Sequence, residues 1–77
     1  MKLSQLAGWY GVLALLGAYG LVSFGVIPAD SLAYQLINIS GALGIVAVAA
    51  SKGDLQPAVL NLAWAGIGVV AILRLVF

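Results

Sequence analysis

Histidine, cysteine, glutamate and threonine are all missing from this 77-residue chain. Without histidine or cysteine, the usual ligands of zinc, haem and iron–sulfur centres are absent, and two aspartates in separate loops cannot surround a metal ion. The same gap excludes a Ser-His-Asp triad and a thiol nucleophile. We therefore predict no catalytic residue, no metal site and no cofactor, and we expect a protein that is not an enzyme.

Charge is equally scarce. Only five side chains are charged at neutral pH: Lys2, Asp30, Lys52, Asp54 and Arg74. The uncharged stretches between them hold 27, 21 and 19 residues, and about 20 helical residues cross the hydrocarbon core of a bilayer. Three cations spread over two membrane faces make no basic patch, so nucleic acid is not an expected partner.

The apolar content supports the same conclusion. The mean hydropathy is +1.24 and 65% of the residues are hydrophobic, which leaves too little polar surface for a soluble domain of this size. We predict an all-α integral membrane protein with three transmembrane helices in a compact bundle. Residues 1–77 form one transmembrane domain, with helices at about 5–26, 31–50 and 55–76.

Turn and capping residues support these boundaries. Gly25 and Pro28 are expected to end the first helix, and Asp30 or Ser31 to cap the second. The second break is Ser51-Lys52-Gly53-Asp54, with Gly53 suited to a left-handed cap. A cleaved signal peptide is the alternative for the first segment, but the apolar run from Leu6 to Ile27 exceeds the roughly 7 to 15 residues of such a peptide.

The basic residues favour one orientation weakly. Lys2 and Lys52 share one membrane side and Arg74 lies at the other. Basic residues are retained on the cytoplasmic side, so we expect a multi-pass inner-membrane protein with a cytoplasmic N-terminus. A bias of two against one leaves insertion in both orientations open.

Glycines recur in all three predicted helices. Helices in lipid are held together by close backbone approach, which small residues allow, so we interpret the glycines as packing surfaces. The predicted packing residues are Gly8, Gly11, Gly17, Gly20, Gly41, Gly44 and Gly68.

Polar side chains inside the predicted spans are the candidate functional residues, because a polar group in hydrocarbon is costly unless it finds a partner. They are Tyr19, Tyr34, Gln35, Asn38, Asn61 and Trp64. They serve either as hydrogen-bonding contacts between helices or as the lining of a small-solute pocket.

Depth and helical spacing predict which of these residues meet. Tyr19 and Asn38 lie at a similar depth and are predicted to pair, whereas Asn61 lies about 10 Å or more from Asn38 along the membrane normal. Tyr19 is expected to share one face of its helix with Gly8 and Gly11, and Tyr10 to lie on the opposite face.

Two functions fit this pattern. The first is a small-solute transporter or channel that acts as a homo-oligomer, with Asn38 and Asn61 in its path. The alternative is a non-catalytic accessory or assembly subunit of a larger membrane complex. In both, the lipid bilayer is a partner, and the sequence identifies no small-molecule ligand.

Two resemblances add to this interpretation. Tyr34-Gln35 followed by Asn38 and Gly41, with Asn61 and Trp64 in the third helix, resembles a family of small bacterial inner-membrane proteins without an assigned function. That resemblance covers residues 8–73. In layout, with its Lys52-Gly53-Asp54-Leu55 turn and Asn61, the chain is weakly similar to the SemiSWEET sugar half-transporters, three-helix units that dimerise around a central path. The Pro-Gln hinge of that family has no counterpart here.

Overall fold

Three helices make up the computed structural model, which describes residues 2–77. They are α1 (Leu3–Ser23), α2 (Leu32–Lys52) and α3 (Leu55–Val76). Each is long and apolar enough to cross a membrane. Large apolar side chains such as Leu13, Leu62 and Ile67 are exposed on the outside of the molecule, where lipid can cover them.

The helix ends follow from capping chemistry. Helix α1 ends at Ser23, three residues earlier than expected, because Gly25 adopts a φ of 74°. This left-handed conformation lets the Val26 amide donate to the Leu21 carbonyl at 2.8 Å, which closes the helix. Gly53, with a φ of 73°, ends α2 in the same way.

The starts of α2 and α3 are capped differently. Of the two predicted caps for α2, Ser31 has the role: its Oγ accepts a hydrogen bond from the Tyr34 amide at 3.2 Å. Asp54 occupies the cap position of α3 without a side-chain hydrogen bond. Pro57 lies in the first turn of α3, where its missing N–H costs little.

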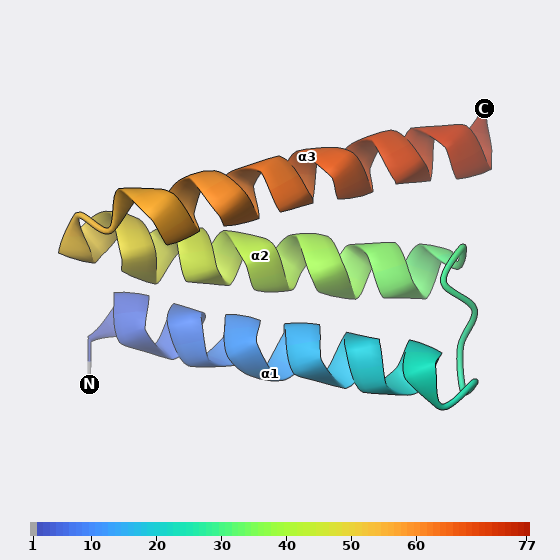
Figure 1. Ribbon diagram of the computed structural model, residues 1–77, viewed down its shortest axis with the longest axis horizontal. Helices are drawn as coiled ribbons and strands as arrows, with labels where there is room; N and C mark the ends of the chain where they lie inside the picture. The colour runs from blue at the N-terminus through green and yellow to red at the C-terminus, as the bar shows by residue number, and fades with distance from the viewer. Residues whose placement is uncertain (1) are drawn as a thin grey trace.

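Helix α2 lies between the other two (Figure 1), and within residues 2–77 no Cα of α1 comes within 8 Å of a Cα of α3. The compact unit that results measures 35 × 25 × 18 Å. The start of α1 and the α2–α3 turn lie at one end, and the α1–α2 loop and the C-terminus at the other (Figure 1). Helix α2 alone therefore has both flanks covered by protein.

Small residues form both helix contacts. The buried positions are Gly8, Gly11, Ala18, Asn38, Gly41, Ala42, Gly44, Ala49, Ala65 and Gly68. A Cβ on Gly11 would meet the Gly41 carbonyl oxygen, and one on Gly44 would meet the Ala7 carbonyl oxygen. On the other flank of α2, a Cβ on Gly68 would lie 2.6 Å from an Ile39 side-chain carbon. The backbones thus approach each other as the glycine pattern predicts.

Two of the predicted packing glycines lie outside both helix contacts. A Cβ added to Gly17 or Gly20 would meet nothing within 4 Å, so neither packs against α2. Each lies nine residues after a glycine that does pack, Gly8 and Gly11 respectively. Nine residues are two and a half helical turns, which places Gly17 and Gly20 on the far side of α1. The prediction that they belong to the packing surface of the chain was wrong.

Candidate functional site

Asn38 connects α2 to α3 and is the one buried polar side chain among residues 2–77, with 6% of its surface exposed. Its Nδ2 donates to the Tyr34 carbonyl at 2.9 Å, and its Oδ1 accepts from Trp64 Nε1 at 3.3 Å. Both groups of the amide therefore have a partner, as burial away from water demands.

The predicted pair of Tyr19 and Asn38 does not form. Tyr19 is 69% exposed, and Asn38 bonds Trp64 instead. Ala18, which is 1% exposed, takes the inward position next to it on α1. Ala18 lies seven residues, about two turns, after Gly11 and so continues its stripe, whereas Tyr19 is rotated a further 100° away from it.

Asn38 and Asn61 form hydrogen bonds with different partners. Asn61 is half-buried, and its Nδ2 donates to the Pro57 carbonyl of its own helix at 2.9 Å. Gln35 reaches the loop before α2, where its Nε2 donates weakly to the Ala29 carbonyl at 3.5 Å. Within residues 2–77, Asn38 and Asn61 share no hydrogen bond, in keeping with their difference in depth.

Four of the predicted site residues line one groove between α2 and α3, which we name the α2–α3 groove. Its lining residues are Tyr34, Gln35, Asn38, Trp64, Ile67 and Gly68, and its volume is about 200 Å³. Drug-sized ligand pockets begin at roughly 300 Å³. The groove of a single chain is therefore small and lacks an outer wall. Asn61 and Tyr19 are not among its lining residues.

Tyr10 of α1 and Ser40 of α2 form a hydrogen bond that the sequence did not predict. Ser40 Oγ donates to the Ile37 carbonyl at 3.1 Å and lies 2.6 Å from the Tyr10 hydroxyl. Because the serine proton is used, the Tyr10 hydroxyl is the donor to Ser40. Tyr10 was expected to lie opposite the packing face. It instead lies beside that face, and its long side chain reaches across to α2.

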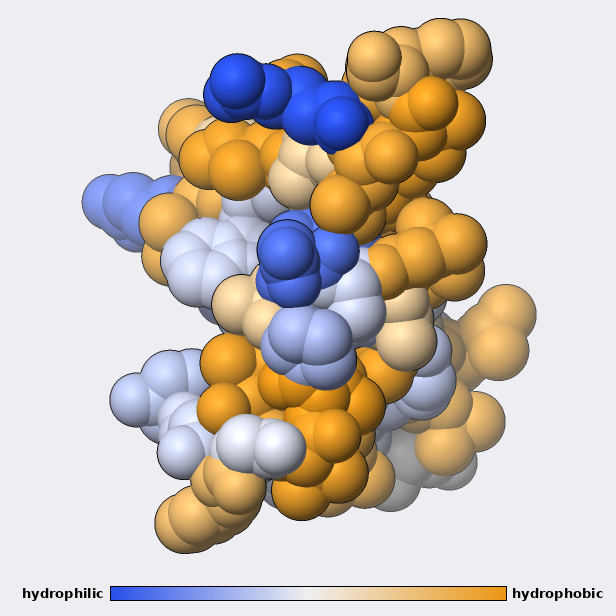
Figure 2. All heavy atoms as spheres, turned by 90° about the vertical axis from the view of Figure 1, so that its right-hand side faces the viewer, coloured by the Kyte–Doolittle hydropathy of each residue, from blue (hydrophilic) through white to orange (hydrophobic). Residues whose placement is uncertain are grey.

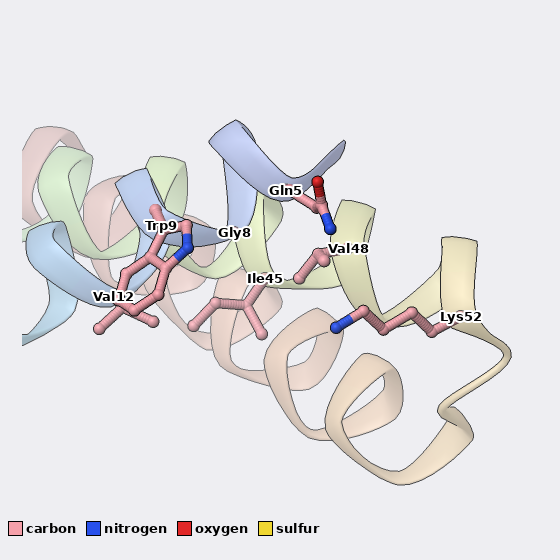
Figure 3. A pocket seen from close by; sticks show the side chains of 7 residues that line it. All are labelled: Gln5, Gly8, Trp9, Val12, Ile45, Val48 and Lys52. Carbon is pink, nitrogen blue, oxygen red and sulfur yellow. The ribbon is translucent and has the colours of Figure 1, made fainter. Parts of the chain in front are cut away.

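A second groove, the α1–α2 groove, lies near the end of the molecule that holds the start of α1. It has a volume of about 340 Å³ and is lined by Gln5, Gly8, Trp9, Val12, Ile45, Val48 and Lys52 (Figure 3). The two grooves use the same face of α2. Helical spacings of 4, 7 and 7 residues connect Tyr34 and Asn38 of the first groove to Ile45 and Lys52 of the second. Both grooves therefore open on the same side of the molecule.

The opposite end of the molecule carries a third depression, lined by Ala29, Asp30, Gln35, Ala71, Arg74 and Leu75. Figure 2 shows this end, where strongly hydrophilic atoms lie near the top and in the centre of the view, with hydrophobic atoms between and around them. Asp30 and Arg74 place opposite charges here, at the level where a membrane-spanning chain meets water. Nowhere in residues 2–77 do three His, Cys, Asp or Glu side chains converge on a point that could hold a metal ion.

Comparisons with known proteins give one match. No curated protein and no solved structure matches the chain. The sequence model of an uncharacterised protein family matches residues 4–77, which includes all three helices apart from Leu3. The chain belongs to this uncharacterised family.

Proposed function

We propose that the protein acts as a homo-oligomer that carries a small solute through the bilayer along the α2–α3 groove. The observation that supports this proposal is a groove within the spans that lacks an outer wall and has the polar groups of Gln35, Asn38 and Trp64 among a mainly apolar lining. Asn38 lies six residues into α2, about 9 Å along the helix from Leu32. Its depth is that of the hydrocarbon core, where polar linings mark solute pathways.

A second copy supplies the missing wall. Three helices in one layer enclose no passage, because α1 and α3 do not meet. In a two-fold dimer the same surface of each copy faces the other, so that two α2–α3 grooves join around the axis. Trp64 and Ile67 of α3, which are 49% and 70% exposed, then lie on the wall of a shared path. The resemblance in layout to the SemiSWEET half-transporters, which dimerise around a central path, favours the same assembly.

A tryptophan at position 67 is expected to block the path. Ile67 lines the groove and is exposed, so Ile67→Trp fills the groove while the helix contacts stay intact. The measurement is volume recovery of proteoliposomes after osmotic shock with glycerol, erythritol or a hexose, followed by light scattering. Wild-type vesicles are expected to recover faster than protein-free vesicles for at least one solute, and Ile67→Trp to bring that rate down to the protein-free rate.

Leu62→Trp is the matched control, because Leu62 is 59% exposed on α3, lies about 140° around the helix from Ile67 and does not line the groove. It is expected to leave the recovery rate unchanged. Recovery of wild-type vesicles at the protein-free rate for every solute, or equal recovery of the Ile67→Trp and wild-type vesicles, would contradict the proposal.

A second candidate function is favoured by the glycines that contact nothing. Gly17, Gly20 and Gly66 present backbone on the outer surfaces of α1 and α3, with open space around each added Cβ. Such surfaces suit a further transmembrane helix. They fit the accessory or assembly subunit of a larger membrane complex. If the protein is such a subunit, it will co-purify with a partner subunit at a fixed ratio, and Gly20→Leu is expected to abolish that co-purification. If it transports a solute as a homo-oligomer, no other subunit will co-purify with the wild-type protein.

We place the protein in the inner membrane with the Lys2 and Lys52 end in the cytoplasm. Lys2 caps the start of α1 and Lys52 ends α2, whereas Arg74 lies in the last turn of α3, at the other end of the molecule. Retention of basic residues on the cytoplasmic side supports this orientation.

A further inference from the structure

The α1–α2 groove is surrounded at its mouth by hydrogen-bond donors. Lys52 contributes an ammonium group and Gln5 an amide, and Figure 3 shows the lysine and glutamine nitrogens turned toward the groove. Trp9 follows Gly8, which packs on Val48, and so lies deeper, beside the floor. No aspartate is among the lining residues. A mouth with N–H donors and one positive charge fits an anion that brings several acceptor oxygens.

The orientation of Gln5 is fixed by its own helix. The Lys2 backbone amide donates to Gln5 Oε1 at 3.0 Å. A backbone amide can only donate, so the atom that it bonds must be the oxygen. The amide nitrogen of Gln5 is thereby left to donate toward the groove.

The floor of the groove is apolar. It is formed by Val12 of α1 and by Ile45 and Val48 of α2. From Lys52 to Ile45 the floor runs seven residues, about 10 Å, from the membrane surface into the hydrocarbon region. The groove thus combines a cationic mouth at the depth of lipid headgroups with an apolar floor at the depth of acyl chains.

We propose that the α1–α2 groove binds one anionic phospholipid. Its phosphate accepts hydrogen bonds from Lys52 and Gln5, and one acyl chain lies along Val12, Ile45 and Val48. Charge complementarity and the change from polar to apolar lining with depth favour a lipid over a soluble anion, because a soluble anion has no apolar part to contact the floor. Basic pockets between transmembrane helices bind anionic headgroups in this way. The site opens on the same side of the molecule as the α2–α3 groove but shares no lining residue with it, and it does not depend on the proposed solute path.

Loss of the lysine charge is expected to weaken lipid binding. The full-length protein in neutral detergent is mixed with phosphatidylglycerol or phosphatidylcholine of identical acyl chains, and bound lipid is counted by native mass spectrometry. Wild-type protein is expected to retain phosphatidylglycerol in preference to phosphatidylcholine. Lys52→Gln is expected to weaken phosphatidylglycerol binding about fivefold, the effect of one basic residue at a membrane surface.

Lys2→Gln is the matched control, because it removes the same charge at the same end of the molecule and keeps the backbone amide that holds Gln5. It is expected to leave lipid binding unchanged. Val12→Trp, at a position 38% exposed, fills the floor and is expected to weaken binding while Lys52 is intact.

Three results would overturn the proposal. The first is equal retention of the two lipids by wild-type protein. The second is an equal effect of Lys52→Gln and Lys2→Gln, with helix content unchanged by circular dichroism. The third is displacement of phosphatidylglycerol by millimolar inorganic phosphate together with unchanged binding in Val12→Trp, which would make the groove a site for a free anion.

Discussion

Gly44→Ala is expected to lower the free energy of unfolding by about 1 to 3 kcal/mol, the usual cost of an extra methyl group in a packed contact. The added Cβ would meet the Ala7 carbonyl oxygen of α1. That oxygen belongs to the helix backbone and cannot rotate away as a side chain can, so α1 and α2 must separate. The measurement is reversible unfolding in mixed micelles with increasing SDS, followed by circular dichroism.

Gly17→Ala is the control for this experiment. It adds the same methyl group to a membrane helix at a position with nothing within 4 Å. Alanine favours a helix over glycine by up to about 1 kcal/mol, so this variant is expected to be as stable as the wild type or slightly more stable. Equal destabilisation by the two substitutions would show that α1 does not pack on α2 through the Gly44 position.

Asn38→Leu is expected to destabilise the contact between α2 and α3. Asn38 is buried, and its Oδ1 is the acceptor for Trp64 Nε1. Leucine leaves the indole N–H of Trp64, which is 49% exposed, without that acceptor, and the loss of one hydrogen bond costs about 0.5 to 1.5 kcal/mol. Trp64→Phe removes the donor instead and leaves the Asn38 oxygen unpaired.

The strength of this pair is measured by combining the two substitutions. If the hydrogen bond links the helices, the losses in unfolding free energy will not add, and the double variant will be more stable than their sum predicts. The expected coupling is about 0.6 kcal/mol and at most about 1.7 kcal/mol, the range for hydrogen bonds between membrane helices. Additive losses would assign the effect of each residue to packing alone.

The sequence by itself determined the three helices and the glycines that end the first two. Five charges divide the chain into three apolar stretches, and the structure places one helix in each. Gly25 and Gly53 end their helices because both adopt the left-handed φ that other residues avoid. These features depend on neighbouring residues and on the length needed to cross lipid, so they can be predicted from local sequence.

Helical periodicity accounts for part of the arrangement of the candidate residues. The spacings of four and three residues put Tyr34, Asn38 and Gly41 on one stripe of α2, and Asn38 and Gly41 are buried there. Spacing determines which residues of a helix share a face. It does not determine which neighbouring helix that face meets, so the partner of Asn38 was expected to be Tyr19 and is Trp64.

Only the tertiary structure decided which of several similar residues on a helix contact another helix. Gly11 and Gly20 are both helical glycines of α1, yet Gly11 meets α2 and Gly20 meets nothing, because a helix has several sides and α1 packs with one. The same holds for the α1–α2 groove. Gln5 and Lys52 are 47 positions apart and join one groove because α1 and α2 run antiparallel beside each other. Local sequence specifies each helix, whereas the packing of one helix on the next specifies which side chains act together.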